Sequence, residues 1–164
     1  HKILKRLKAT PISTGTIMLP HFLVNSLLCI SGTIILLIVG ILVFDLHFWG
    51  NFLSFLFAYL LSVACVFSIG FLIAAVAPNN RAANAIAYLV YFPMLFLSGA
   101  TIPLQVMPDT IVAISKFIPL THAVDILVGT WMGDPLSSYT KTIAILFIIT
   151  VVCTGVSIKT FRWE

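Results

Sequence analysis

Few residues of this 164-residue chain are of types that carry out chemistry, and their spacing matches no catalytic motif. The sequence has no Gly-x-x-x-x-Gly-Lys-Ser/Thr phosphate loop, no Gly-x-Ser-x-Gly turn and no His-Glu-x-x-His motif. Its three cysteines lie in separate apolar runs without Cys-x-x-Cys spacing, which favours neither a metal site nor disulfides. We therefore expect no catalytic residue, no metal ligand and no cofactor bound by this chain, and no enzymatic activity of its own.

The polar pair that comes closest to a site is His122 and Asp125, three residues apart and so on one face of a helix. Such a pair could bind a ligand or orient the imidazole. A local pair that fixes the helix at a membrane interface explains the same spacing, and we favour it because paired charges are often structural.

The elements that position these residues are long apolar runs. Charged residues make up 9% of the chain, against about 25% in ordinary soluble domains, and the mean hydropathy is +1.14. A helix needs about 20 apolar residues to cross roughly 30 Å of hydrocarbon. We therefore predict an all-α, polytopic membrane bundle. Four intervals contain no Asp, Glu, Lys or Arg: Ala9 to Phe44, Leu46 to Asn80, Ala82 to Pro108 and Thr142 to Ile158.

Four spanning helices are predicted within residues 12–164, at about 17–44, 52–77, 82–98 and 138–158. Asn25, in the first, is interpreted as part of a transport path or as an interhelical hydrogen-bonding residue, and we favour the second. Pro93, one turn before Ser98 and Gly99, predicts a kink or an end in the third.

The segment from about residue 100 to 135 differs from the spans because prolines cut it into pieces too short to cross. We predict a re-entrant or interfacial helical hairpin here. Its second helix carries apolar residues at the spacing of an amphipathic helix, namely Leu120, Ala123, Val124, Leu127, Val128 and Trp131.

The first eleven residues form a short basic amphipathic helix in our prediction, ended by Thr10 and Pro11. Its composition slightly favours binding to anionic lipid over docking to a cytoplasmic protein. The basic residues cluster at the ends of apolar runs, so the net charge of +4 does not indicate a nucleic-acid partner. Because the chain opens with His1, we expect that it lacks the N-terminal part of a larger subunit.

Lysine and arginine are distributed unevenly between the two sides that four crossings would create. Seven lie on the side of the termini and two, Lys116 and Lys141, on the other. The positive-inside rule then places both termini in the cytoplasm and the proline-cut segment outside. The seven are Lys2, Lys5, Arg6, Lys8, Arg81, Lys159 and Arg162.

Several segments, taken in order, resemble the permease subunits of type-2 ATP-binding-cassette exporters. The resemblance covers almost the whole chain and is specific for the family, but not for a substrate. The matching stretches are Leu4 to Ser13, Ala74 to Arg81, Phe92 to Ala100 with Pro103 and Pro108, and Pro119 to Asp125.

The resemblance implies a six-span subunit of a prokaryotic cell membrane, of which this chain holds the later four spans. It implies a dimer with a second permease subunit, identical or different, and a separate nucleotide-binding subunit that binds ATP and magnesium. It also reverses our reading of the basic helix, which becomes a coupling helix docked on that ATPase. Membrane lipid is the remaining partner.

The site residues that the resemblance implies fall into two groups. Contact with the ATPase is assigned to Lys2, Lys5, Arg6, Lys8 and Thr10. The re-entrant segment is assigned Pro93, Ser98, Gly99, Pro103, Pro108, Pro119, Thr121, His122 and Asp125. The alternative is a small membrane channel or a helix-assembling scaffold without ATP coupling. A channel should show polar or charged rings along its pore, and the spans carry almost no charge.

Overall fold

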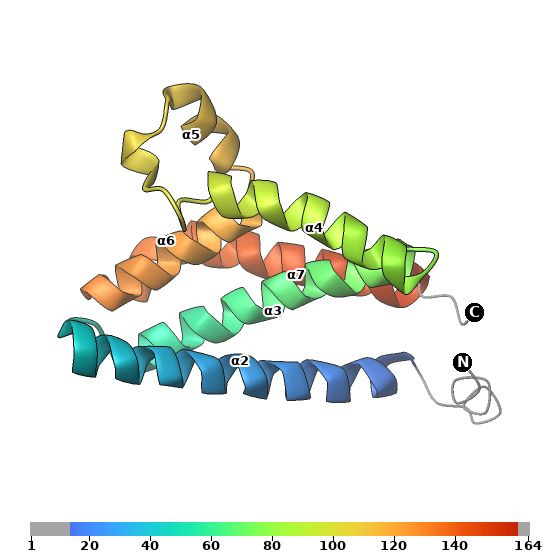
Figure 1. Cartoon of the computed structure of the whole chain (residues 1–164), viewed down its shortest axis with the longest axis horizontal. Coiled ribbons are helices and arrows are strands. Elements are labelled where there is room, and N and C mark those ends of the chain that lie inside the picture. The colour runs from blue at the N-terminus through green and yellow to red at the C-terminus, as the bar shows by residue number, and fades with distance from the viewer. Residues whose placement is uncertain (1–13, 161–164) are drawn as a thin grey trace. The chain divides into compact units, whose positions relative to one another are not determined.

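The computed structural model describes residues 14–160, and every regular element among them is helical (Figure 1). The all-α fold class predicted from the sequence is confirmed. The elements in chain order are α2 (Thr14–Phe44), α3 (Phe52–Val76), α4 (Asn80–Leu97), η1 (Leu104–Val106), α5 (Asp109–Ser115), α6 (Pro119–Met132), η2 (Leu136–Tyr139) and α7 (Thr140–Thr160).

The chain divides into two compact units. The described part of the first unit contains α2, the residues up to His47 and the end of α7 from Ile158. The second unit runs from Phe48 to Ser157 and contains α3, α4, α5, α6 and most of α7. The outer segment predicted from the sequence therefore belongs to the same compact unit as three of the long helices.

Within residues 14–160, three helices are long and apolar enough to cross a membrane: Leu23–Phe44, Phe52–Val76 and Leu136–Thr160. Helix α4, where we predict the third span, is not among them because Asn80, Arg81 and Asn84 make its first turns polar. Its 18 residues still rise about 27 Å, close to the roughly 30 Å of a hydrocarbon core. The crossing by α4 stays a prediction.

Amide side chains begin two of the helices. The Asn51 side chain accepts a hydrogen bond from the N–H of Leu53 at 2.9 Å at the start of α3. The Asn79 side chain accepts one from the N–H of Ala82 at 2.8 Å at the start of α4. Each bond satisfies a backbone donor that the first turn of a helix leaves without a partner.

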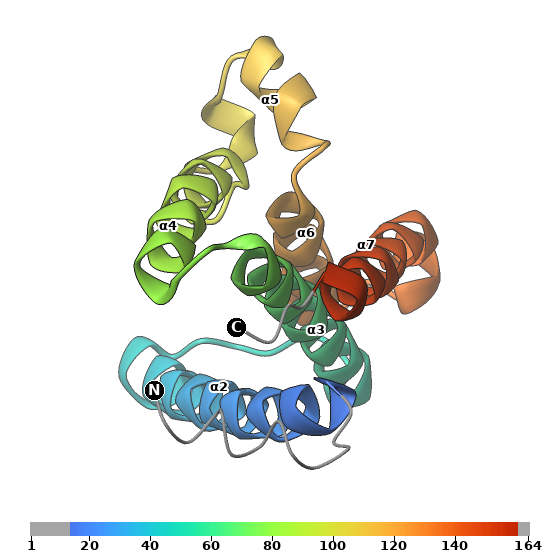
Figure 2. The ribbon, with the colours of Figure 1, turned by 90° about the vertical axis from the view of Figure 1, so that its right-hand side faces the viewer.

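The second unit is built around α3. Figure 2 shows α4, α6 and α7 around α3, with α5 standing away from them. The fully buried apolar residues are Ala58 and Cys65 on α3, Ala123 and Ile126 on α6, and Leu146 on α7. Many large apolar side chains of this unit are exposed instead; Leu53 and Leu89, for example, are 73% and 75% exposed. Small residues on α3 and α6 thus take part in the contacts between helices beside Ile126 and Leu146, as is usual in a bilayer.

Hydroxyl groups are buried among these small residues. On α3, Ser62 donates a hydrogen bond to the carbonyl of Ala58 at 2.8 Å and Ser68 to that of Cys65 at 2.7 Å. Ser157 on α7 donates instead to the carbonyl of Phe71 on α3, at 3.1 Å. The first two bonds satisfy each hydroxyl within its own helix, whereas the third links two helices.

The buried face of α6 differs from the amphipathic stripe predicted for it. Leu120, Ala123 and Leu127 pack in the core as expected, but Val128 is half exposed. Ile126 and Thr130, both outside the predicted stripe, are fully buried. The prediction assumed that the most apolar face of a helix is the buried one, as it is in water. In lipid an apolar face can stay exposed, so this assumption does not hold.

Two close approaches depend on glycine. A Cβ at Gly50 would overlap the carbonyl oxygen of Thr130, a backbone atom of α6. A Cβ at Gly129 would overlap the hydroxyl of Tyr139, which donates a hydrogen bond to Asp134 at 2.8 Å. At Gly155 on α7, by contrast, no heavy atom would lie within 4 Å of the added Cβ.

We predict that Gly50→Ala destabilises the protein and that Gly155→Ala does not. Overpacking typically costs about 1 to 3 kcal/mol, and each kcal/mol shifts the Tm of a chain of this size by roughly 2 to 4 °C. Thermal unfolding of the purified proteins in one detergent measures both variants. Gly155→Ala serves as the matched control because its space is open. A Gly50→Ala protein with the same Tm as the wild type would show that residues 48–51 do not lie against α6.

Candidate functional site

The basic amphipathic helix predicted for residues 1–11 lies outside the described residues. This concerns all five residues assigned to contact with an ATPase: Lys2, Lys5, Arg6, Lys8 and Thr10. Their role stays a prediction.

Asn25 lies on α2, in the first compact unit, and is exposed. The residues of the predicted outer segment belong to the other unit. A part for Asn25 in a transport path therefore stays a prediction, as does interhelical hydrogen bonding.

The end of α4 is held by hydroxyl groups. Pro93 lies inside this helix, which continues to Leu97. Ser98 and Thr101 both donate hydrogen bonds to the carbonyl of Leu95, at 3.1 and 3.4 Å. Gly99 has φ 85°, the left-handed conformation that lets the chain turn away from the helix. The carbonyl of Leu95, near the end of the helix, thereby accepts hydrogen bonds from the protein and needs no water.

Prolines divide the segment that follows. Pro103 precedes η1, and the carbonyl of Pro108 accepts the N–H groups of Ile111 and Val112 at the start of α5. Helices α5 and α6 are bent by 93° relative to each other. This geometry fits a re-entrant loop or a broken span, and the re-entrant reading stays a prediction.

The corner between α5 and α6 contains the predicted polar residues. Pro119 is the first residue of α6. Proline fits this position because the N–H group that it lacks would have no partner within the helix. His122 lies with its Nε2 2.9 Å from the carbonyl oxygen of Lys116, so the imidazole donates this hydrogen bond and ties α6 to the end of α5. Asp125 is exposed, and Thr121 is buried with a hydroxyl that has no partner among the described residues.

His122 therefore makes a local structural contact, but with a different partner from the one expected. Spacing along one helix indicated Asp125, whereas the bond crosses the corner to a backbone carbonyl. Within residues 14–160, no group of three or more His, Cys, Asp or Glu is placed to hold a metal ion.

An aromatic cluster anchors the chain between α2 and α3 to the end of α6. The ring of Trp131 meets those of Phe48 and Phe55 edge to face, with centroids 4.9 and 5.7 Å apart. The N–H of Trp49 also donates to the carbonyl of Trp131 at 3.2 Å. The sequence indicates an interfacial aromatic belt here, but not that Phe48 would pack against a residue 83 positions later. Only the tertiary fold brings the two together.

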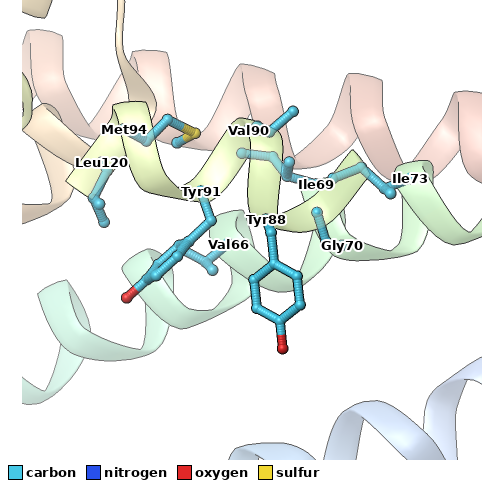
Figure 3. A pocket seen from close by; sticks show the side chains of 10 residues that line it. Val66, Ile69, Gly70, Ile73, Tyr88, Val90, Tyr91, Met94 and Leu120 are labelled. Carbon is cyan, nitrogen blue, oxygen red and sulfur yellow. The ribbon is translucent and has the colours of Figure 1, made fainter. Parts of the chain in front are cut away.

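A cavity of about 240 Å³ lies between α3 and α4 (Figure 3). Val66, Ile69 and Gly70 line it from α3, and Tyr88 and Tyr91 from α4. In Figure 3 the hydroxyls of both tyrosines point to one side, away from α4. The sequence reading missed this cavity, although one signal was present: two tyrosines three residues apart in an otherwise apolar run.

Comparisons with known proteins give the family. Residues 1–132 match the family model described as ABC-2 type transporter. Over 85 residues, or 52% of the chain, it is 36% identical to Nodulation protein J of Rhizobium leguminosarum bv. viciae, covering 33% of that protein. Over 121 residues, or 73% of the chain, it is 35% identical to ABC transporter G family member 20 of Dictyostelium discoideum, covering 16% of it.

The chain thus spans about a third of the first of these relatives and less of the second. No solved structure matches it. The family match covers most of the chain, from residue 1 to the last residue of α6. The sequence is therefore that of a multi-pass membrane protein that belongs to the ABC-2 type transporter family.

Proposed function

We propose that this chain forms part of the permease subunit of an ATP-driven exporter and contains the later four of its six spans. The match of residues 1–132 to the ABC-2 type transporter family carries the proposal. Three helices of spanning length and apolar composition support it. The substrate path would lie between two permease subunits, identical or different, that open alternately to each side of the membrane.

ATP and magnesium, in this proposal, bind to a separate nucleotide-binding subunit. Residues 1–164 contain no phosphate-binding loop, and in this proposal the energy is delivered by contact with that subunit. We assign that contact to the basic helix of residues 1–11. Its cations would meet acidic groups of the partner, and its movement would be passed on to the spans.

The proposed setting is the cell membrane of a prokaryote, with both termini in the cytoplasm. Seven lysines and arginines fall on the side of the termini and two on the other. The seven-to-two difference supports this orientation and places the α5 and α6 segment outside.

We predict that a membrane-impermeant maleimide labels Asp109→Cys in intact cells and labels Lys2→Cys only after permeabilisation. Both variants are made in a background without Cys29, Cys65 and Cys153, so that only the new thiol reacts. Labelling of detergent-solubilised protein is the control for reactivity. The opposite pattern in intact cells would invert the proposed orientation.

We further predict that Lys5→Glu combined with Arg6→Glu in the full-length subunit abolishes substrate-stimulated ATP hydrolysis and co-purification of the ATPase. Charge reversal replaces attraction by repulsion, and like charges placed opposite each other cost several kcal/mol at an interface. Insertion into the membrane should persist because the spans are unchanged.

The matched control reverses two cations on the other side of the membrane in the proposed topology, Lys116→Glu with Lys141→Glu. It should leave ATP hydrolysis stimulated by substrate. Loss of coupling in both double variants would indicate a general effect of charge. Retained coupling in the Lys5 and Arg6 variant, with only weaker binding to anionic vesicles, would make the helix a lipid anchor and contradict the coupling proposal.

A further inference from the structure

The cavity between α3 and α4 has the size and character of a site for one hydrocarbon chain. An apolar cavity of about 150 Å³ suffices to bind benzene, whereas pockets for drug-sized ligands hold about 300 to 1,000 Å³. The 240 Å³ found here lie between these limits. Apolar side chains of Val66, Ile69 and Met94 line the cavity and offer a ligand mainly dispersion contacts.

In the proposed topology, the cavity lies at the depth of lipid acyl chains. Its lining residues on α4 run from Ala87 to Met94, six to thirteen residues after Arg81. At 1.5 Å per residue they lie about 9 to 20 Å further along the helix axis than Arg81. With Arg81 at the level of the headgroups, these residues fall in the middle of a hydrocarbon core roughly 30 Å thick.

Gly70 leaves the α3 side of the cavity open. No heavy atom would lie within 4 Å of a Cβ added there. On the α4 side, Tyr88 and Tyr91 are 62% and 48% exposed, so their rings border the cavity without closing it. A flexible chain can therefore enter from the surrounding bilayer.

Arg81 supplies the charge that selects among membrane lipids. It is exposed in the first turn of α4, and it is the one charged residue between Asp45 and Asp109 in the sequence. No carboxylate near it in sequence competes for the guanidinium, which binds phosphate well through its fork of donors. Basic residues at cytoplasmic helix ends are typical binding sites for anionic headgroups.

We propose that α3 and α4 bind a phosphate-bearing anionic lipid, with its headgroup at Arg81 and one acyl chain in the cavity. Arg81 and the lining residues from Ala87 to Met94 lie on one helix, the first at headgroup level and the others at acyl-chain level, as the two ends of a single lipid require. The site rests on the topology proposed above, with α4 crossing the membrane and Arg81 at its cytoplasmic end, but not on transport: it would hold a lipid in a subunit that transports nothing.

The test uses the full-length subunit in phosphatidylcholine vesicles that contain a phosphatidylglycerol with a photoactivatable diazirine in its acyl chain. Irradiation should attach the lipid mainly to residues 87–94 and 66–73. Gly70→Leu fills the cavity from α3 and should reduce this labelling at least tenfold. Gly155→Leu adds the same side chain in the open space on α7 and should leave it unchanged.

Ala87→Leu fills the cavity from the opposite helix and guards against a folding defect that is peculiar to Gly70→Leu. Size-exclusion chromatography in detergent selects variants that elute as the wild type does. Arg81→Gln should reduce the preference for phosphatidylglycerol over a phosphatidylcholine with the same diazirine about fivefold, as expected for one basic residue. Lys141→Gln should leave that preference unchanged.

Any one of four results would overturn the proposal. One is labelling spread evenly over α3, α4 and α7, which indicates ordinary surrounding lipid. Another is full labelling in both cavity-filling variants, or an unchanged lipid preference in Arg81→Gln. The last comes from a separate variant with a photoactivatable amino acid at position 87: crosslinking of that residue to a second copy of the chain in place of lipid would make the cavity part of a subunit interface.

Discussion

Close approach between helices through small residues is the constraint on which the second compact unit depends. In water, burial of large apolar side chains drives helices together, but lipid is as apolar as leucine and removes this advantage. Helix α3 accordingly presents Ala58, Ser62 and Cys65 to its neighbours, while Leu53 and Phe57 face outward. The buried serines bond to carbonyls of their own helix and pack like small apolar groups.

The same constraint explains where packing is incomplete. Contacts built from small residues are close only where both helices present them. Around Gly70 the facing helix presents Tyr88 and Tyr91, whose rings border a cavity beside a residue with no side chain. A void of this size forfeits dispersion contacts along its whole lining. Methylene groups of a lipid restore those contacts, so an incomplete helix interface becomes a binding site.

The sequence predicts where the helices begin and end better than it predicts which of their faces are buried. Uncharged runs bounded by Asp45, Asn51 and Pro78 indicate α2 and α3 because a long apolar segment has few alternatives in a bilayer. Pro119 likewise indicates the break before α6. The buried positions of Ile126 and Thr130 could not be predicted, since periodicity shows which face is apolar and not which face meets a helix. The contact of His122 with Lys116 was hidden for a related reason: it crosses the 93° corner, which spacing along one helix does not describe.

The aromatic cluster fixes the start of the second compact unit to α6. The second compact unit begins at Phe48, the residue whose ring packs against Trp131. Phe48, Trp49 and Gly50 are thus held to α6 by ring contacts, a backbone hydrogen bond and a close approach. Between α2 and this anchor lie only residues 45–47, where Asp45 has the left-handed φ of 52°. The chain that leaves α2 therefore enters the second unit at residues that ring contacts and a backbone hydrogen bond fix to α6.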